Sequence, residues 1–130
     1  PPSHYKAASG KWIAEIVSRL SGKAPVILFS RGTLGSFTQL IETGAPFLSV
    51  DWTADLEEIR TRIPDGMGLQ GNLDPALLTT SPGVAANETQ RILETMRGFQ
   101  RYIFNLGHGV TKDARLESIE AVVTTVRNFQ

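Results

Sequence analysis

Pro25-Val26-Ile27-Leu28-Phe29 (PVILF) is a short run in which every residue is apolar, and it lies between Gly22 and Gly32. Its length and its glycine borders favour a strand over a helix. Continuous rather than alternating hydrophobicity is typical of a strand that is buried on both faces, as the strands of parallel sheets are. This run therefore predicts an α/β protein with a parallel sheet.

The pattern of a short apolar run followed by a longer amphipathic stretch repeats along the rest of the chain. Further strands are expected at residues 46–50, 67–70 and 102–106. Apolar side chains at helical spacing predict helices at residues 7–20, 34–43, 53–62, 84–98 and 114–129. Strands that alternate with helices imply parallel pairing through right-handed crossovers.

Four strand–helix units give two possible architectures. They cover about half of a (β/α)8 barrel, which needs roughly 250 residues, or they form a small open doubly wound sheet. The pattern alone does not separate these two. In both, a ligand site lies at the loops that follow the carboxyl ends of the strands.

Composition and charge limit the class of protein. The chain of 130 residues is 41% hydrophobic and 20% charged, which is typical of a globular domain. Thirteen basic residues balance thirteen acidic ones, so there is no cationic surplus for nucleic-acid binding. The sequence has no cysteine, which excludes disulfides and thiolate metal sites, and no apolar run long enough to cross a membrane. We expect a cytoplasmic protein.

Among the residues that follow the predicted strands, His108 is the most notable because it lies between Gly107 and Gly109. A histidine in such a position is open to a cleft, and its imidazole can donate a hydrogen bond to a carboxylate or transfer a proton. The alternative is a histidine that bonds only to neighbouring backbone carbonyls. A metal role is not expected, because the other histidine, His4, lies in the N-terminal segment.

Other polar residues of these loops have a ligand-binding and a structural interpretation. Asp51 and Asp74 follow strands and are candidates for acid–base chemistry, but Asp51 is equally suited to fix its loop, and Asp74 before Pro75 is typical of a helix cap. We expect Asn72 to brace its loop. Arg31 is either a partner for a ligand carboxylate or a solvated charge.

Two of the loops carry a resemblance to a known family. Residues 69–78 (LQGNLDPALL) and residues 105–110 (NLGHGV) resemble the two C-terminal signatures of the uroporphyrinogen decarboxylase family, in the same order and at a fitting separation. Residues 24–29 and 48–52 are similar to the preceding strands of that family. Two departures are Arg31, where lysine is commoner, and residues 111–115, which lack the prolines usual there.

The resemblance implies that residues 1–130 are the C-terminal half of a distorted (β/α)8 barrel whose N-terminal half is missing. It implies decarboxylation of the four acetate side chains of uroporphyrinogen III to give coproporphyrinogen III in porphyrin and haem biosynthesis. The family uses no cofactor or metal, binds a tetrapyrrole and forms a homodimer. The start at Pro1-Pro2, in place of Met, favours the interpretation as part of a longer protein.

Of the family's substrate-contact positions, only His108 falls inside this sequence, matching the histidine of the NLGHG signature. The resemblance places the catalytic residues upstream of Pro1. We therefore expect a substrate-binding role for His108, no catalytic residue in this chain, and no activity of the chain by itself.

Two alternatives to the decarboxylase remain. A corrinoid methyltransferase-like member of the superfamily needs zinc ligands, typically His and Cys, and a sequence with only His4 and His108 argues against it. A small non-enzymatic α/β binding module would instead be a compact monomer with a closed hydrophobic core.

Overall fold

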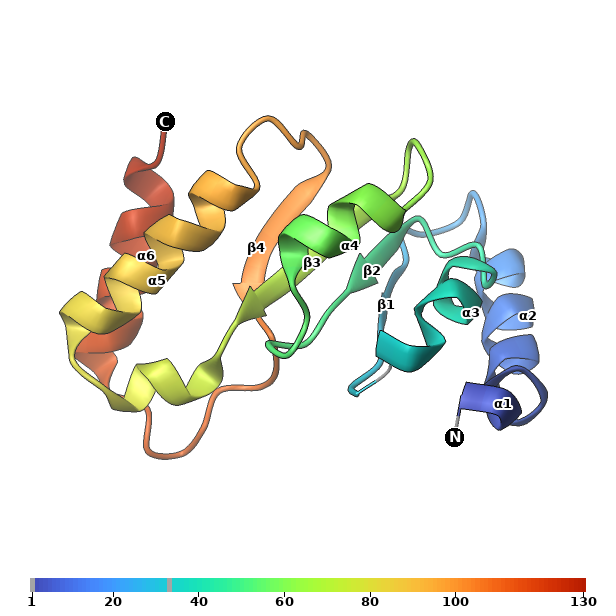
Figure 1. Cartoon of the computed structure of the whole chain (residues 1–130), viewed down its shortest axis with the longest axis horizontal. Coiled ribbons are helices and arrows are strands. Elements are labelled where there is room, and N and C mark those ends of the chain that lie inside the picture. Colours follow the sequence, from blue (N-terminus) through green and yellow to red (C-terminus); the bar gives the residue numbers. More distant parts are fainter. Residues whose placement is uncertain (1, 33) are drawn as a thin grey trace.

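The sheet of this protein consists of four parallel strands in the order β1-β2-β3-β4 (Figure 1). The structure is a computed structural model that describes residues 2–32 and 34–130. Pro1 lies outside the described residues, as does Thr33 in the loop that follows the first strand. Neighbouring strands pair parallel, as predicted, and their order in the sheet follows the sequence. The bounds of the strands are Ile27–Phe29 (β1), Phe47–Ser49 (β2), Gly68–Leu73 (β3) and Tyr102–Leu106 (β4).

Helices precede, connect and follow the strands at the predicted places, with shifted ends. Caps explain several starts: Asp55 accepts a 2.9 Å hydrogen bond from the Glu57 N–H, and Pro82 occupies the first turn of its helix. The expected helices at residues 7–20 and 34–43 are each divided into shorter segments. The bounds are Pro2–Tyr5 (α1), Lys6–Gly10 (η1), Lys11–Leu20 (α2), Leu34–Ser36 (η2), Phe37–Ile41 (α3), Leu56–Arg62 (α4), Pro75–Thr79 (η3), Pro82–Thr95 (α5) and Leu116–Asn128 (α6).

The hydrophobic core lies between the sheet and one layer of helices. Leu48, Leu69 and Leu73 project from the strands and are at most 1% exposed. They belong to one core cluster with helix side chains such as Ile59 of α4 and Ile92 of α5. Figure 1 shows α3 and α4 in front of this face of the sheet, with α5 and α6 side by side beyond β4. The sheet therefore has one covered face.

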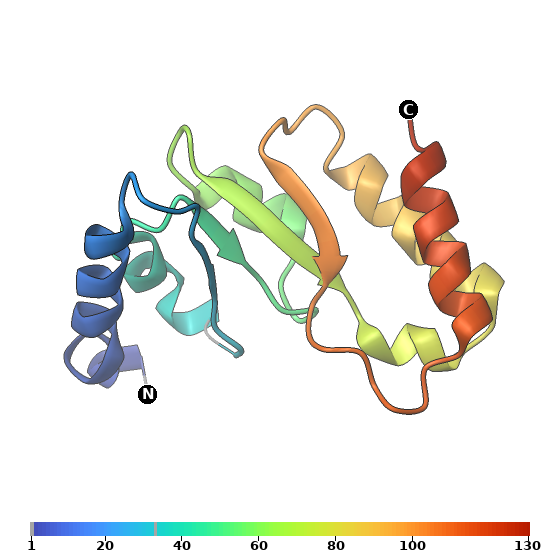
Figure 2. The ribbon, with the colours of Figure 1, turned by 180° about the vertical axis from the view of Figure 1, so that it is seen from behind.

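The opposite face of the sheet is uncovered by the described residues, as the view from behind shows (Figure 2). Ile27 is 43% exposed, Phe29 is 42% exposed and Ile103 is 40% exposed. The prediction that the PVILF run is buried on both faces is therefore wrong for this chain. Continuous hydrophobicity indicates two faces that need cover, but here β1 is an edge strand and only its Leu28 side packs on the core.

The strand β3 is longer than predicted. It continues to Leu73, whereas the sequence favoured a loop after residue 70. Its pairing with β4 extends to Leu73 opposite Leu106. The Tyr102 hydroxyl donates to the Gly71 carbonyl oxygen, and burial raises the pKa of Tyr102. Asn72 and Leu73 are accordingly strand residues, and the loop begins at Asp74.

Apolar side chains are also exposed on the helices α2 and α6. Trp12 and Ile16 of α2 are 56% and 58% exposed, and Leu116 and Val123 of α6 are 66% and 41% exposed. The helical stripes predicted from the sequence are therefore only partly covered in the chain as described. None of the described helices combines the length and the hydrophobicity that crossing a lipid bilayer requires.

We expect the chain expressed alone to pair with another copy or to aggregate. Both β1 and β4 are edge strands of apolar sequence, and unpaired backbone groups on such edges pair with other chains. Size-exclusion chromatography over a range of concentrations measures this association. A soluble monomer that unfolds cooperatively at all concentrations would contradict the prediction.

Candidate ligand-binding site

Three loops meet at the carboxyl ends of the strands, and we call residues 30–32, 51–53 and 107–109 the mouth. These loops lie toward the lower edge of the sheet in Figures 1 and 2. Gly107 brings the third loop against the second, because a Cβ at this position would lie 3.0 Å from the Asp51 carbonyl carbon and from the Trp52 Cα. The Gly107 N–H donates a 2.8 Å hydrogen bond to the Leu73 carbonyl oxygen.

His108 lies between two aromatic rings of the mouth region. Its ring centroid is 6.0 Å from that of Phe29 and 6.0 Å from that of Trp52, both in edge-to-face arrangements. The imidazole is exposed. Residues from the ends of β1, β2 and β4 thus surround one imidazole that solvent and a ligand can reach. The sequence pointed to His108 but gave no indication of its aromatic neighbours.

Asp51 holds two of these loops together. Its Oδ2 accepts a 2.6 Å hydrogen bond from the Gly32 N–H, and its Oδ1 accepts bonds of 2.9 and 2.5 Å from the Thr53 N–H and hydroxyl. Burial alone would raise the pKa of Asp51, but these hydrogen bonds and the nearby Arg31 charge outweigh it and hold the pKa below its ordinary value. Asp51 is therefore suited to act as a fixed hydrogen-bond acceptor, and it is not suited to donate a proton at neutral pH.

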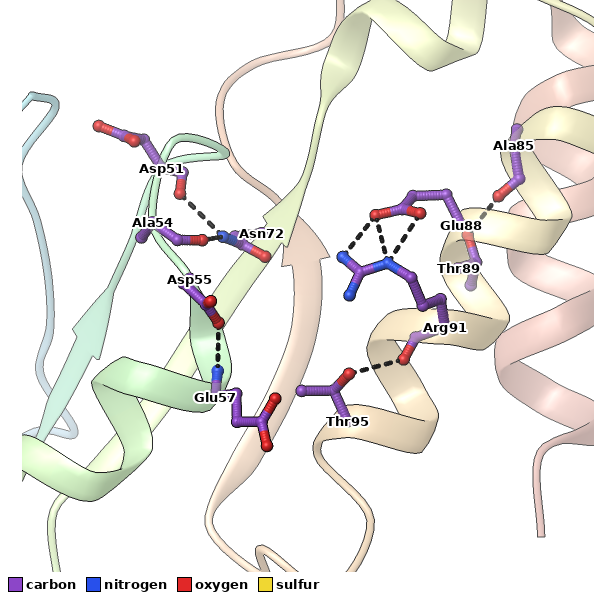
Figure 3. A network of polar contacts seen from close by, with 10 residues as sticks. All are labelled: Asp51, Ala54, Asp55, Glu57, Asn72, Ala85, Glu88, Thr89, Arg91 and Thr95. Carbon is purple, nitrogen blue, oxygen red and sulfur yellow. Dashed lines mark hydrogen bonds and ion pairs between the residues drawn. The ribbon is translucent and has the colours of Figure 1, made fainter.

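Asn72 braces the same region from the interior (Figure 3). A bracing role was expected, but the loop that Asn72 holds is the one after β2 and not its own. Its side chain is buried, and its Nδ2 donates to the Asp51 carbonyl oxygen at 3.0 Å and to the Ala54 carbonyl oxygen at 2.7 Å. A single amide thus satisfies two carbonyls of the loop that follows β2. Loop carbonyls that are buried without a partner are strongly destabilising, so this contact fixes the shape of the mouth.

Asp74 has the structural role that its Asp-Pro sequence favoured. It is the N-cap of η3, and its Oδ1 accepts a 2.9 Å hydrogen bond from the Ala76 N–H. Asp51 and Asp74 are thus both engaged by backbone N–H groups. The hypothesis of a carboxylate pair for acid–base chemistry finds no support in this geometry.

Trp52 connects two other residues of the mouth. Its half-buried indole contacts both His108 and Arg31. The Arg31 guanidinium carbon lies 5.2 Å from the centroid of the indole ring. The sequence carried one signal for a place of Trp52 in the site, which is its position next to Asp51 just after a predicted strand.

A second hollow, which the sequence did not predict, lies on the helix-covered side between α4 and α5. It has a volume of about 280 Å³, and its lining includes Asp55, Asn72 and Arg91. Arg91 forms a forked pair with Glu88, with distances of 2.7 to 3.0 Å (Figure 3). Because that guanidinium is already neutralised by Glu88, Arg91 offers no free positive charge to a ligand in this hollow. Among the described residues, His, Asp and Glu side chains form no group of three that could hold a metal ion.

The parallel sheet, the helices between its strands and the mouth at the carboxyl ends define part of a (β/α) barrel. A solved structure of a methyltransferase from Methanosarcina mazei has the same fold, with a TM-score of 0.82 and 20% sequence identity, over 99% of this chain and 38% of that chain. At this identity the likeness concerns the fold alone.

Comparisons of sequence identify the family. The family model of uroporphyrinogen decarboxylase (URO-D) matches residues 1–129. Curated relatives named uroporphyrinogen decarboxylase include those of Vesicomyosocius okutanii, 34% identical over 97% of this chain, and of Legionella pneumophila strain Paris, 37% identical over 98%. The chain belongs to the uroporphyrinogen decarboxylase family. It spans 37% of the length of these relatives.

Proposed function

We propose that this chain forms the C-terminal wall of a uroporphyrinogen decarboxylase, which converts the acetate side chains of uroporphyrinogen III to methyl groups. The observation that carries the proposal is the convergence of His108, Trp52 and Phe29 at the carboxyl ends of three strands, in a chain whose relatives bear this name. In this proposal a preceding segment supplies the remaining strands and the catalytic residues. The enzyme needs no cofactor and forms a homodimer.

The uncovered face of the sheet supports the idea of a barrel completed by further strands. Ile27, Phe29 and Ile103 project on that face, and a closed barrel fills its interior with side chains of this kind. The free edges of β1 and β4 would pair with the strands of the preceding segment. The chain by itself is then expected to be inactive.

The chemistry that we propose requires an enclosed site with donors for carboxylates. Protonation of a pyrrole ring at carbon makes the ring an electron sink, so that the carbon–carbon bond to the departing carboxylate breaks as carbon dioxide leaves. The other carboxylates of the substrate must be held still while this happens. In this scheme His108 donates a hydrogen bond to one of them, and its role is binding.

Replacing His108 with asparagine in the full-length polypeptide is expected to raise KM for uroporphyrinogen by about tenfold or more, with a smaller decrease in kcat. A hydrogen bond to a charged group contributes about 1.5–3 kcal/mol, which corresponds to this range. The shorter asparagine amide cannot reach the position of the distal ring nitrogen. Steady-state kinetics measures both constants.

A matched control for this variant is the replacement of His4 with asparagine, because His4 is exposed on α1, at the opposite end of the chain. We expect its KM and kcat to equal those of the unmodified enzyme. If His108→Asn leaves KM unchanged while kcat collapses, His108 takes part in the chemical step and the binding role is wrong.

A further inference from the structure

Arg31 differs from most other arginines of the chain in its partners. Five arginines, namely Arg19, Arg62, Arg91, Arg97 and Arg115, form ion pairs with glutamates close by in the sequence. Arg31 is exposed at the mouth and, within residues 2–32 and 34–130, has no acidic side chain at ion-pair distance. Its guanidinium therefore makes no direct ion pair with a carboxylate of the described residues.

The nearest carboxylate of the mouth, Asp51, is already occupied. Both of its oxygens accept hydrogen bonds from Gly32 or Thr53. Arg31 influences this carboxylate through its charge without a direct bond. An acid that is engaged in this way holds the loop in place and leaves the guanidinium available to an external anion.

Trp52 holds the guanidinium at the mouth, where such an anion can reach it. The Arg31 guanidinium carbon lies over the indole ring, 5.2 Å from the ring centroid. A cation–π contact uses the charge of a guanidinium and does not occupy its N–H donors in hydrogen bonds. Arg31 therefore keeps donors for a carboxylate, and a side chain already held near a ring loses less conformational freedom when a ligand binds.

The same indole connects Arg31 to His108, whose ring centroid lies 6.0 Å from that of Trp52. Two cationic or hydrogen-bonding groups therefore flank one aromatic ring, and their separation cannot exceed the sum of these two short distances. A ligand with several carboxylates around an aromatic or pyrrolic body matches this arrangement in both charge and shape.

We propose that Arg31 is a second substrate-positioning residue of the mouth, which binds one carboxylate of a polycarboxylate ligand bidentately while His108 binds a neighbouring one. The inference rests on the proposed function and adds to it a particular anchor and its geometry. It also gives the arginine at this position a role that lysine would fill less well, since an ammonium group is a point charge without a fork.

The test uses the full-length polypeptide with Arg31→Gln and Arg31→Lys, and uroporphyrinogen as the substrate. We expect Arg31→Gln to raise KM about tenfold or more with kcat changed by less than about threefold. Arg31→Lys should give an intermediate KM, because the charge stays and the fork is lost. The pattern across the two variants separates carboxylate binding from a merely structural role.

Arg101→Gln is the matched control. Arg101 also stacks on an aromatic ring, 4.9 Å from the Phe47 centroid, but it precedes β4 and so lies at the other end of the sheet. We expect its KM to be unchanged. An unchanged KM for Arg31→Gln in an active enzyme would overturn the inference, and so would a collapse of kcat at constant KM.

A direct binding measurement keeps the inference testable if the unmodified enzyme does not decarboxylate uroporphyrinogen. In that case the proposed function fails, and equilibrium titration with coproporphyrin, a tetracarboxylate porphyrin, compares the unmodified protein with Arg31→Lys. A dissociation constant at least threefold higher for the variant supports Arg31 as an anchor. Equal dissociation constants would contradict it. The lysine variant also carries the test if Arg31→Gln fails to fold.

Discussion

Replacing Gly107 with alanine is expected to destabilise the protein by about 3 kcal/mol and to lower kcat/KM for uroporphyrinogen about 100-fold. The added Cβ would overlap the Trp52 backbone nitrogen and lie 3.0 Å from the Asp51 carbonyl carbon. These are backbone atoms, which cannot rotate away as the end of a side chain can. The loop that carries His108 must then move away from the loop that carries Trp52. Urea denaturation and steady-state kinetics measure the two effects.

Gly109→Ala is the control for this substitution. A Cβ at Gly109 would have no neighbour within 4 Å, although it lies only two residues along the same loop. We expect its urea midpoint to stay within the equivalent of about 0.5 kcal/mol of the unmodified protein. If Gly107→Ala behaves like Gly109→Ala, the loops of the mouth do not depend on this close approach, and the site described here is not rigid.

The sequence predicted the secondary structure well where short-range patterns determine it. The apolar runs gave all four strands, because strand length and glycine borders are local properties. The Asp74–Pro75 pair gave the start of η3 for the same reason, since a cap and its helix are adjacent in sequence. The parallel pairing of the strands also followed, from the alternation of strands with helices along the chain.

Features that depend on distant residues were harder to predict. Burial of the PVILF run depends on what covers it, and neither Ile27 nor Phe29 has cover from the described residues. The end of β3 depends on Leu106 across the sheet, 33 residues later in the chain. In the candidate site, local sequence pointed to His108 between two glycines and to a bracing role for Asn72. The stacking of Arg31 on Trp52 was not found, because it joins side chains that follow two different strands.

Replacing Asn72 with aspartate is expected to destabilise the protein by about 3–5 kcal/mol at neutral pH, the range for an uncompensated buried charge. The asparagine Nδ2 donates to the carbonyl oxygens of Asp51 and Ala54 (Figure 3). A carboxylate has no donor, so its oxygens would face two carbonyl oxygens in a buried position. Because aspartate is nearly isosteric with asparagine, a change in packing contributes little to this effect.

The pH dependence of the Asn72→Asp variant distinguishes charge from loss of the amide. The buried carboxyl group has its pKa raised in the folded state, because only its protonated form can donate to a carbonyl. The extra destabilisation is therefore present above the folded-state pKa, and it decreases as the pH falls and the group takes up a proton. Urea midpoints measured at several pH values, relative to the unmodified protein, test this sign.

Two further variants isolate the cause. Asn72→Ala removes the donors without adding charge, so we expect a loss of about 1–3 kcal/mol that does not vary with pH. Asn87→Asp places the same charge on the exposed surface of α5 and should change stability by less than about 0.5 kcal/mol. Equal stability of Asn72→Asp and the unmodified protein at neutral pH would mean that the amide does not hold the loop after β2. The mouth would then need another explanation for its shape, because Asp51 and Trp52 both depend on that loop for their positions.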